Sequence, residues 1–345
     1  MLRTLDVSAQ SMIHRSHPRT DARLFAFRSS ILSALVFQNT AYVILTKLSF
    51  EDSRETYIVS TVVVCAEFVK LLTSSIVLVS LHGLRAFESA LHEIPHNVVQ
   101  LCLPSVLYTI QSLLLFEGVR LLDPTVFLAC SQLKIFTTAC FSFCLLGKVV
   151  TRIQIMALCL LVVGVLLVQV ENVDVPSGEN NMDVHSTMYG LIIVCTAATT
   201  SGFAGVYLEQ MYKRDVKEEY RKSIWFKNVQ LALFSLMSAF LSCYWHDGID
   251  IRQRGFFVGY RIIVMIVVIL QATGGLVVAA VMKHLSNLMK CFAAAFSTCI
   301  CAVVTPLFNH TDHLASKQVT GIILIFSSTF MYTRKPTIAH SLRNE

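Results

Sequence analysis

Charged side chains inside apolar stretches are the residues of this sequence best suited to chemistry. Lys134 lies near the middle of an apolar stretch from 123 to 146, and Lys70 is similarly central in another from 57 to 82. At a rise of about 1.5 Å per residue, neither cation reaches water easily from the centre of a spanning helix. A charge held there needs a partner, so a functional role is the default expectation.

Glu67 is the first candidate partner. It precedes Lys70 by one helical turn, so the two side chains share a helix face and can form an ion pair. Such a pair is either internal scaffolding or part of a binding site. Lys134 has no acidic residue nearby in the sequence, which favours a site whose ligand is an anion.

Lys283 and Lys290 flank the short turn between two further apolar stretches. One interpretation is ordinary anchoring at the cytosolic membrane surface. The other is that two or more lysines face one cavity, where they would suit a diphosphate, with helix N-termini adding to the attraction. The residues alone leave both interpretations open.

Amides and rings inside the apolar stretches supply further contacts for an organic anion. They can hydrogen-bond a base edge and stack on it, although any single one can equally bond a neighbouring helix. Small residues, among them Ser201 and Gly202, either let helices approach closely or clear room for a ligand. The amide and ring candidates are Tyr108, Gln111, Phe127, Tyr207, Asn228, Gln230 and Gln271.

These residues must be positioned by helices in lipid. Of the 345 residues, 54% are hydrophobic and 14% are charged, which is more apolar surface than one soluble core can bury. Apolar runs of about 18 residues or more can span a bilayer as helices that satisfy their own backbone groups. The sequence predicts an all-α membrane protein with ten transmembrane helices, at about 29–48, 57–82, 95–118, 123–146, 151–169, 186–211, 224–245, 257–282, 287–308 and 314–333.

One ten-helix domain, 29–333, is expected between a cytosolic N-terminal tail, 1–28, and a cytosolic C-terminal tail, 334–345. An internal echo, K-x-F-x-x-A, begins at Lys134 and again at Lys290. Five helices repeated as five would invert the second half relative to the first, which is how many secondary transporters are built. The expected halves are about 29–169 and 186–333.

The net charge of +6 reflects membrane topology. With both termini on one side, most Lys and Arg residues fall on that side, so the positive-inside rule places both termini in the cytosol. The basic excess is therefore no footprint of nucleic acid. No removable signal peptide is apparent ahead of the first span.

Metal and enzyme chemistry find little support in the sequence. The 11 cysteines lie mostly inside spans, with neither a disulfide framework nor a zinc pattern. His92-Glu-Ile-Pro-His96 matches H-E-x-x-H, but Pro95 is expected to begin the third span, which leaves His92 outside that helix. We predict no catalytic residue, no metal and no cofactor.

Five strings carry a resemblance that covers residues 29 to 333. They are Gln132-Leu-Lys-Ile-Phe-Thr-Thr-Ala139, Ser201-Gly-Phe-Ala-Gly-Val-Tyr-Leu-Glu209, Trp225-Phe-Lys-Asn-Val-Gln230, Gly274-Gly-Leu276 followed by Lys283, Asn287 and Lys290, and Glu67-x-x-Lys70. Together they resemble the nucleotide-sugar transporters of the UDP-galactose, UDP-N-acetylglucosamine and CMP-sialic acid group. The resemblance implies the drug/metabolite transporter fold with ten spans, Golgi residence, and exchange of luminal nucleoside monophosphate for cytosolic nucleotide sugar.

The resemblance also implies residue roles. It places Lys134 and Lys283 near the substrate phosphates, and it places Tyr108, Gln111, Phe127, Ser201, Gly202 and Asn228 around the nucleotide. Phe127, Leu231-Ala-Leu-Phe234 and Gln271-Ala272 favour a UDP-sugar over CMP-sialic acid, which stays the alternative. Ser112 in place of an Asn, and Cys130-Ser131 in place of a Thr-Tyr pair, depart from the family pattern.

The sequence thus predicts an antiporter that carries UDP-galactose, UDP-N-acetylglucosamine or both into the Golgi lumen by alternating access, with the endoplasmic reticulum as the alternative location. Its expected partners are the nucleotide sugar, the nucleoside monophosphate and the bilayer, while a homo-oligomer and association with glycosyltransferases stay open. One rival is an exporter of organic amines, which central lysines would repel. The other is a non-transporting scaffold or regulator of other carriers, which the departures keep open.

Overall fold

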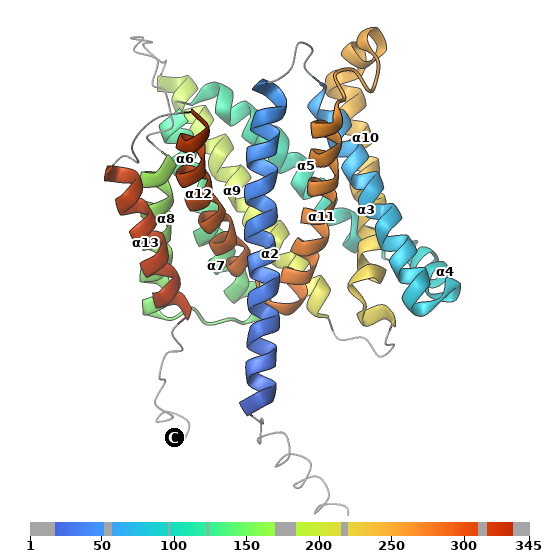
Figure 1. Cartoon of the computed structure of the whole chain (residues 1–345), viewed down its shortest axis with the longest axis horizontal. Helices are drawn as coiled ribbons and strands as arrows, with labels where there is room; N and C mark the ends of the chain where they lie inside the picture. Colours follow the sequence, from blue (N-terminus) through green and yellow to red (C-terminus); the bar gives the residue numbers. More distant parts are fainter. Residues whose placement is uncertain are drawn as a thin grey trace, which may run out of the picture.

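The structure is a computed structural model that describes residues 18–51, 57–95, 97–122, 124–169, 184–214, 220–309 and 316–333. Residues 1–17 of the predicted N-terminal tail, and the predicted C-terminal tail, lie outside the described residues. The elements within the described ranges are helical (Figure 1): α2 (Pro18–Glu51), α3 (Val59–His82), α4 (Leu84–His92), α5 (Val98–Leu121), α6 (Pro124–Ser131), α7 (Leu133–Leu146), α8 (Arg152–Gln169), α9 (Val184–Lys213), the 3-10 turn η2 (Tyr220–Lys222), α10 (Ile224–Arg254), α11 (Ile262–His284), α12 (Asn287–Asn309) and α13 (Ser316–Thr333).

Within these ranges, eight helical segments are long and apolar enough to cross a membrane. They lie in α2, α3, α6 joined to α7, α8, α9, α10, α11 and α12. The other two predicted spans coincide with α5 and α13. The prediction of a helical membrane protein is therefore confirmed, whereas the count of ten and the five-plus-five inverted repeat stay predictions.

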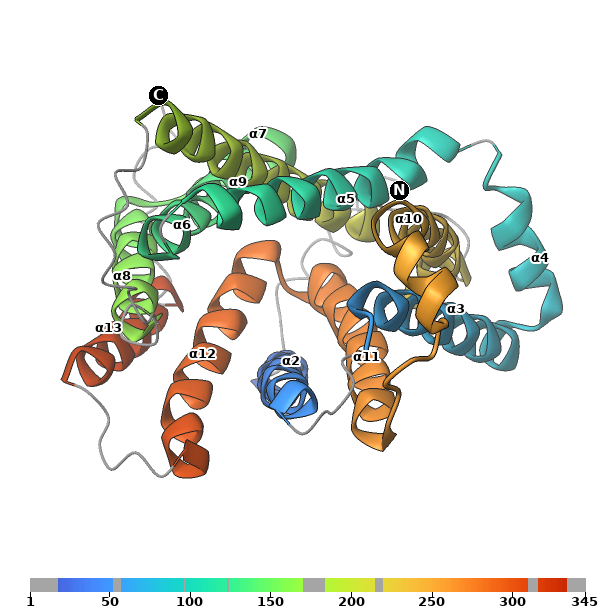
Figure 2. The same ribbon diagram turned by 90° about the horizontal axis from the view of Figure 1, so that it is seen from above.

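Most of the helices pack on one or two partners that are distant in the sequence. α8 packs on α13, α9 on α5 and α7, α3 on α10, and α2 on α11 and α12. Seen from above in Figure 2, α5, α6, α7 and α9 form one row, and α11, α2 and α12 lie opposite them. The α8–α13 pair stands at one flank of the bundle, and the α3–α10 pair stands at the other.

The α8–α13 pair meets through glycines. A Cβ atom added at Gly164 would lie 2.9 Å from the carbonyl oxygen of Gly321, and one added at Gly321 would lie 2.6 Å from the carbonyl oxygen of Gly164. Small residues let membrane helices bring their backbones together. These glycines follow the two copies of the K-x-F-x-x-A echo, so the equivalent helices of the two predicted halves are in direct backbone contact.

The predicted fourth span is broken. α6 ends at Ser131, and α7 begins at Leu133. Ser131 Oγ donates to the carbonyl oxygen of Leu128 at 2.8 Å, and such local side-chain bonds bend helices. The interruption, a single residue at Gln132, places Lys134 in the first turn of α7 and still near the middle of the membrane-spanning segment Val126–Leu146.

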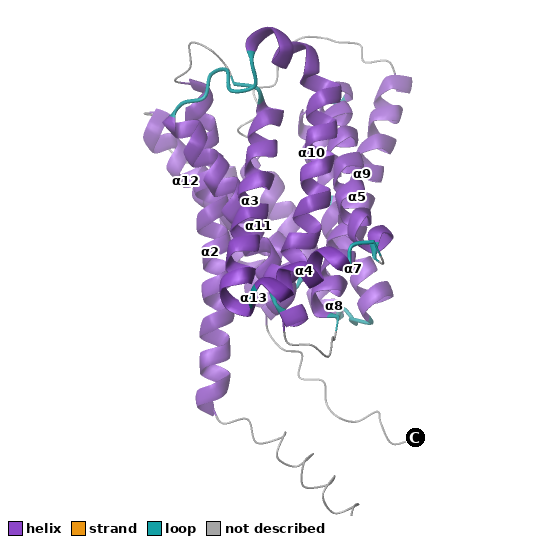
Figure 3. Cartoon of the chain, turned by 90° about the vertical axis from the view of Figure 1, so that its right-hand side faces the viewer, coloured by secondary structure: helices purple, strands orange, loops and turns teal. Residues whose placement is uncertain are grey.

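Two further helical stretches exceed the sequence expectation. α2 begins at Pro18, well before residue 29, and its N-terminal end projects beyond the other helices (Figures 1 and 3). Proline is well tolerated at a first helical position, and the helix continues where the apolar run does not. The short helix α4 follows Gly83, whose φ of 82° turns the chain, and packs on α3 and α10.

Candidate functional site

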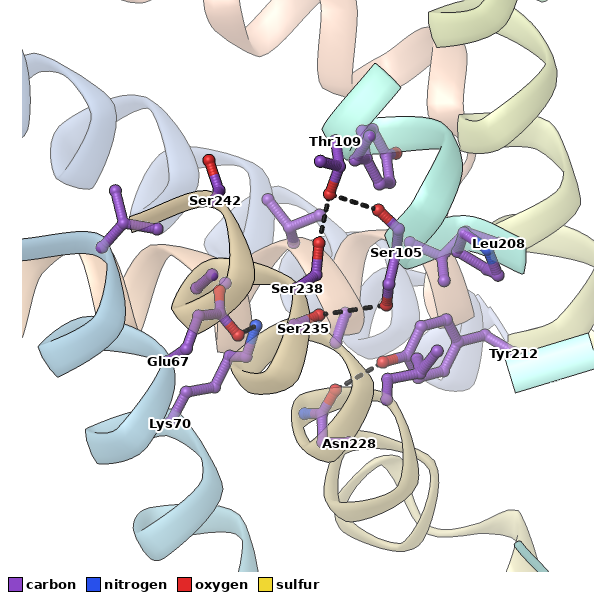
Figure 4. Close-up of a pocket in the computed structure, with 18 of the residues that line it drawn as sticks. Glu67, Lys70, Ser105, Thr109, Leu208, Tyr212, Asn228, Ser235, Ser238 and Ser242 are labelled. Carbon is purple, nitrogen blue, oxygen red and sulfur yellow. Dashed lines mark hydrogen bonds and ion pairs between the residues drawn. The ribbon is translucent and has the colours of Figure 1, made fainter. Parts of the chain in front are cut away.

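A cavity of about 530 Å³ lies between α3, α5, α9, α10, α11 and α12. Pockets for small organic ligands measure about 300–1,000 Å³. Figure 4 shows a charged pair on α3 facing hydroxyl side chains of α5 and α10. The lining includes Ser60, Glu67, Lys70, Ser105, Tyr108, Thr109, Tyr212, Asn228, Ser235, Ser238, Ser242, Gly275 and Lys290.

Glu67 and Lys70 form the ion pair that their spacing predicts. The lysine side chain is 15% exposed and the glutamate side chain 20% exposed, so a ligand in the cavity can reach both. A Cβ atom added at Gly275 of α11 would lie 3.0 Å from Cδ of Lys70. The glycine therefore leaves the room in which the lysine lies.

Two more lysines add positive charge to this region. Lys290, in the first turn of α12, lines the cavity. Lys134 on α7 is exposed and is close enough to Lys290 for the two charges to repel each other. None of the ion pairs within the described ranges includes either lysine. Among the described residues that line the cavity, Glu67 is the only carboxylate, against the cations of Lys70 and Lys290. Lys134 lies outside this lining, near Lys290.

Asn228 and Tyr108 are the other predicted site residues in the cavity lining. Asn228 is only 4% exposed, and its side-chain oxygen accepts a hydrogen bond from the hydroxyl group of Tyr212. This bond joins α9 to α10 at one end of the cavity. Tyr212 was not predicted from the sequence as a site residue.

Lys283 lies at the end of α11 and does not line the cavity. Its ammonium group donates to the carbonyl oxygen of Lys222 in η2. The cation is therefore bound to backbone and not to a carboxylate within the described ranges. Its contact with substrate phosphates stays a prediction.

Tyr207 has a structural partner on α5. Pro104 interrupts that helix and has no N–H group to donate to the carbonyl oxygen of Gln100, four residues earlier. The hydroxyl group of Tyr207 donates to this oxygen at 3.4 Å. The hydroxyl group of Tyr207 therefore satisfies the carbonyl oxygen that Pro104 leaves without a donor. Proline-containing helices within membranes commonly need such a partner.

The remaining predicted residues lie outside the cavity lining. Phe127 on α6 is half-buried and packs near Gly118. Gln111 and Gln271 each have a buried side-chain oxygen with no hydrogen-bond partner among the described residues. The structure therefore does not bring the residues Gln111, Phe127, Lys134, Ser201, Gly202, Tyr207, Gln271 and Lys283 into one pocket with the others, although Lys134 lies near Lys290 of the cavity lining.

Gly202 is buried against α7. A Cβ atom added there would lie 2.8 Å from the backbone nitrogen of Thr138. The position therefore allows α9 to approach the backbone of α7, the helix that carries Lys134. The sequence analysis left two roles open for Gly202, close helix packing or room for a ligand. The contact with the Thr138 backbone supports close helix packing.

Replacing Gly202 by alanine is expected to lower the stability of the protein, because the added methyl group meets backbone that cannot move aside. Overpacking of this kind costs about 1–3 kcal/mol. The apparent melting temperature of the purified protein in detergent measures the effect. Gly248→Ala is the matched control, because its nearest neighbour would be Cδ2 of Tyr244 at 3.8 Å. Equal melting temperatures for the two variants would contradict this role of Gly202.

Glu209 is a buried anion that the sequence analysis did not select. Its side chain is 0% exposed and forms ion pairs with Lys148 and with Lys213, the latter at 2.6 Å. It also accepts a hydrogen bond from the backbone N–H of Asn287 at 2.9 Å. The carboxylate therefore joins α9 to α12 and to the loop before α8. The spacing of Glu209 and Lys213, one helical turn apart, is the sequence signal that could have identified this ion pair.

Apolar helices that surround a charged, partly open cavity define a polytopic membrane transporter. The chain belongs to the nucleotide-sugar transporter family, whose sequence model matches residues 23–333. Members of this family are transporters and not enzymes.

Individual relatives match nearly the whole chain. The UDP-N-acetylglucosamine/UDP-N-acetylgalactosamine transporter nstp-4 of Caenorhabditis elegans is 35% identical, with 88% of this chain and 93% of that protein covered. A UDP-N-acetylglucosamine transporter of Mus musculus is also 35% identical, with 88% and 94% covered. The UDP-galactose/UDP-N-acetylglucosamine transporter srf-3 of Caenorhabditis elegans is 30% identical, with 91% and 84% covered. One crystal structure shares the fold, with a TM-score of 0.61 at 13% identity over 89% of this chain and 97% of that chain.

Proposed function

We propose that the chain is an antiporter that carries UDP-N-acetylglucosamine, UDP-galactose or both into the Golgi lumen in exchange for a nucleoside monophosphate. The observation that carries the proposal is the cavity lined by Lys70 and Lys290, with Lys134 beside it. The relatives support UDP as the nucleotide, because their names specify UDP-N-acetylglucosamine and UDP-galactose.

The charge of the cavity supports a phosphorylated cargo. Two lysines, Lys70 and Lys290, face one carboxylate, that of Glu67, among the described residues of the cavity lining, and Lys134 lies near Lys290. Uncompensated cations are costly in a medium of low polarity. The diphosphate of a UDP-sugar and the phosphate of a nucleoside monophosphate each carry about two negative charges near neutral pH. Either cargo would compensate the lysines, whereas the return of an empty carrier would leave the cations of the cavity without a compensating anion. This difference favours exchange over one-way transport.

Alternating access is proposed from the contacts at one end of the bundle. There Glu209 binds Lys148, Lys213 and the start of α12, and Tyr212 binds Asn228. These contacts hold α9 against α10 and α12, so opening of the cavity at this end requires that they break. We assign this end to the cytosol, because the basic residues gather there as the positive-inside rule expects.

The membrane arrangement that we propose follows from the same assignment. Both termini face the cytosol, and α5 and α13 complete ten membrane-spanning helices. The two halves form an inverted repeat around the cavity, an arrangement that many secondary transporters use. Residence in the Golgi, and any homo-oligomer or complex with glycosyltransferases, are part of the proposal and rest on the family.

A nucleotide screen of the purified protein is the test. We expect UMP and UDP-sugars to raise its apparent melting temperature, and we expect CMP, GMP and their sugars to leave it unchanged at the same concentration. At a ligand concentration of 100 times the dissociation constant, binding stabilises the folded state by about 2.7 kcal/mol, which a melting curve resolves. Stabilisation by CMP and CMP-sialic acid in place of UMP would transfer the assignment to the sialic acid carriers. No stabilisation by any nucleotide would contradict transport and favour a scaffold.

A further inference from the structure

Hydroxyl side chains line the wall of the cavity that faces the Glu67–Lys70 pair. α5 contributes Ser105 and Thr109, and α10 contributes Ser235, Ser238 and Ser242. Residues three or four apart share a helix face, so each set points in one direction. In Figure 4, Ser105 and Thr109 lie beside Ser235 and Ser238 and are joined to them by hydrogen bonds, while Ser242 lies farther along α10.

The hydroxyl groups are paired across the two helices. Thr109 Oγ1 and Ser238 Oγ are hydrogen-bonded to each other, and Ser105 Oγ and Ser235 Oγ are 3.4 Å apart. A hydroxyl group has one hydrogen to donate and two lone pairs that accept, so each pair keeps unused acceptors. The 3.4 Å contact is also longer than the usual hydroxyl–hydroxyl distance of about 2.7–2.8 Å, so it can be exchanged for bonds to a ligand.

Hydroxyl groups often hold membrane helices together, but packing does not account for every polar group on this wall. Asn228 is 4% exposed, and its side-chain nitrogen has no hydrogen-bond partner among the described residues. Figure 4 shows this nitrogen on the side of the amide that faces away from Tyr212. A buried donor without an acceptor is unfavourable, and a ligand in the cavity that Asn228 lines could supply the acceptor.

We propose that this wall is the sugar subsite, in which Ser105, Thr109, Ser235 and Ser238 bind the hydroxyl groups of the hexose. The inference rests on the proposed function and identifies the part of the cavity that binds the sugar. In a nucleotide sugar the hexose is attached directly to the diphosphate. A diphosphate held by Lys70 and Lys290 therefore places the hexose against a neighbouring wall of the same cavity.

The chemistry of the wall also bears on selectivity. Serine and threonine hydroxyl groups rotate and can donate or accept, so they can follow a hexose hydroxyl group that changes from one epimer to the other. A wall of this kind binds a hexose without strict discrimination between epimers. The sugars of UDP-N-acetylglucosamine and UDP-galactose differ in configuration at C4 and in the 2-acetamido group of the former. Both the hydroxyl and the amide groups offer donors and acceptors to such a wall, so we expect the two ligands to use the same subsite.

The test compares ligands that differ by the sugar. The variant combines Thr109→Val with Ser238→Ala, and it removes both partners of one hydrogen bond so that neither is left unpaired in the protein. Dissociation constants of the full-length purified protein for UMP, UDP-N-acetylglucosamine and UDP-galactose are measured by calorimetry. We expect both UDP-sugars to bind about tenfold more weakly and UMP to bind as it does to the wild type. Ser75→Ala is the control, because this hydroxyl group bonds to the carbonyl oxygen of Leu71 in α3 and does not line the cavity.

The possible results separate failure of the sugar subsite from failure of the proposed function. Unchanged binding of the UDP-sugars, or an equal loss for UMP, would overturn the sugar subsite and leave the proposed function standing. A wild-type protein that binds neither UMP nor the UDP-sugars would overturn both. If the first variant does not fold, the pair Ser105→Ala and Ser235→Ala gives the same comparison on the adjacent contact.

Discussion

Lys134→Ala is expected to abolish nucleotide-sugar exchange in reconstituted vesicles while the protein still folds. Lys134 forms no ion pair within the described ranges, so its removal leaves no protein charge unpaired. A bound phosphate would lose one nearby cation, and a hydrogen bond to a charged group contributes about 1.5–3 kcal/mol, or about tenfold or more in affinity. Uptake of labelled UDP-sugar into vesicles loaded with UMP measures the loss.

Lys317→Ala is the matched control for this variant. Lys317 is an exposed lysine in the first turn of α13 and does not line the cavity, so its loss is expected to leave exchange intact. Lys134→Arg keeps the charge but changes the shape of the cation, and it should retain part of the activity. Undiminished uptake by Lys134→Ala would remove this lysine from the mechanism.

Removal of both Lys148 and Lys213 is expected to destabilise the protein strongly. The two substitutions to alanine would leave the carboxylate of Glu209 fully buried, with the N–H of Asn287 as its remaining partner. An uncompensated charge left by a broken buried pair costs about 3–5 kcal/mol. The apparent melting temperature in detergent measures the effect.

A third substitution separates this charge effect from a loss of packing. Glu209→Gln removes the buried charge, so the triple variant is expected to regain most of the stability that the double variant loses. This recovery is the expected sign for a charge that is costly only when it is unpaired. A triple variant no more stable than the double variant would show that the lysines act through packing alone.

Apolar length and spacing in the sequence were enough to predict the helical bundle, because spanning segments are set by the bilayer. The break between α6 and α7 was not predictable from hydropathy, since it arises from local hydrogen bonds inside a continuously apolar run. Ser131 Oγ donates to the carbonyl oxygen of Leu128, and the backbone N–H of Gln132 donates to that of Ala129. Helix α4 was also missed. Its residues follow the span directly, and a glycine with positive φ separates them from it.

Local spacing predicted the Glu67–Lys70 pair, whereas residues that meet through tertiary packing could not be grouped in advance. The string Ser201–Glu209 illustrates the difference. Gly202 packs on α7, and a Cβ at Gly205 would lie 2.7 Å from Cγ of Asn287. Tyr207 bonds to α5, and Glu209 binds two lysines. The string that resembles the family most specifically therefore makes most of these contacts with other helices, and Leu208 is its one residue among the described cavity lining.

The glycine contact between α8 and α13 constrains how the molecule can move. At Gly164 and Gly321 the two backbones come close enough that a Cβ on either glycine would meet the carbonyl oxygen of the other, and the β-branched side chains of Ile325 and Val168 pack around this contact. Packed interfaces of this kind shift as a unit and do not deform gradually. The α8–α13 flank would then act as the hinge. The α3–α10 flank, on the other side of the bundle, would move through the larger arc when the cavity opens.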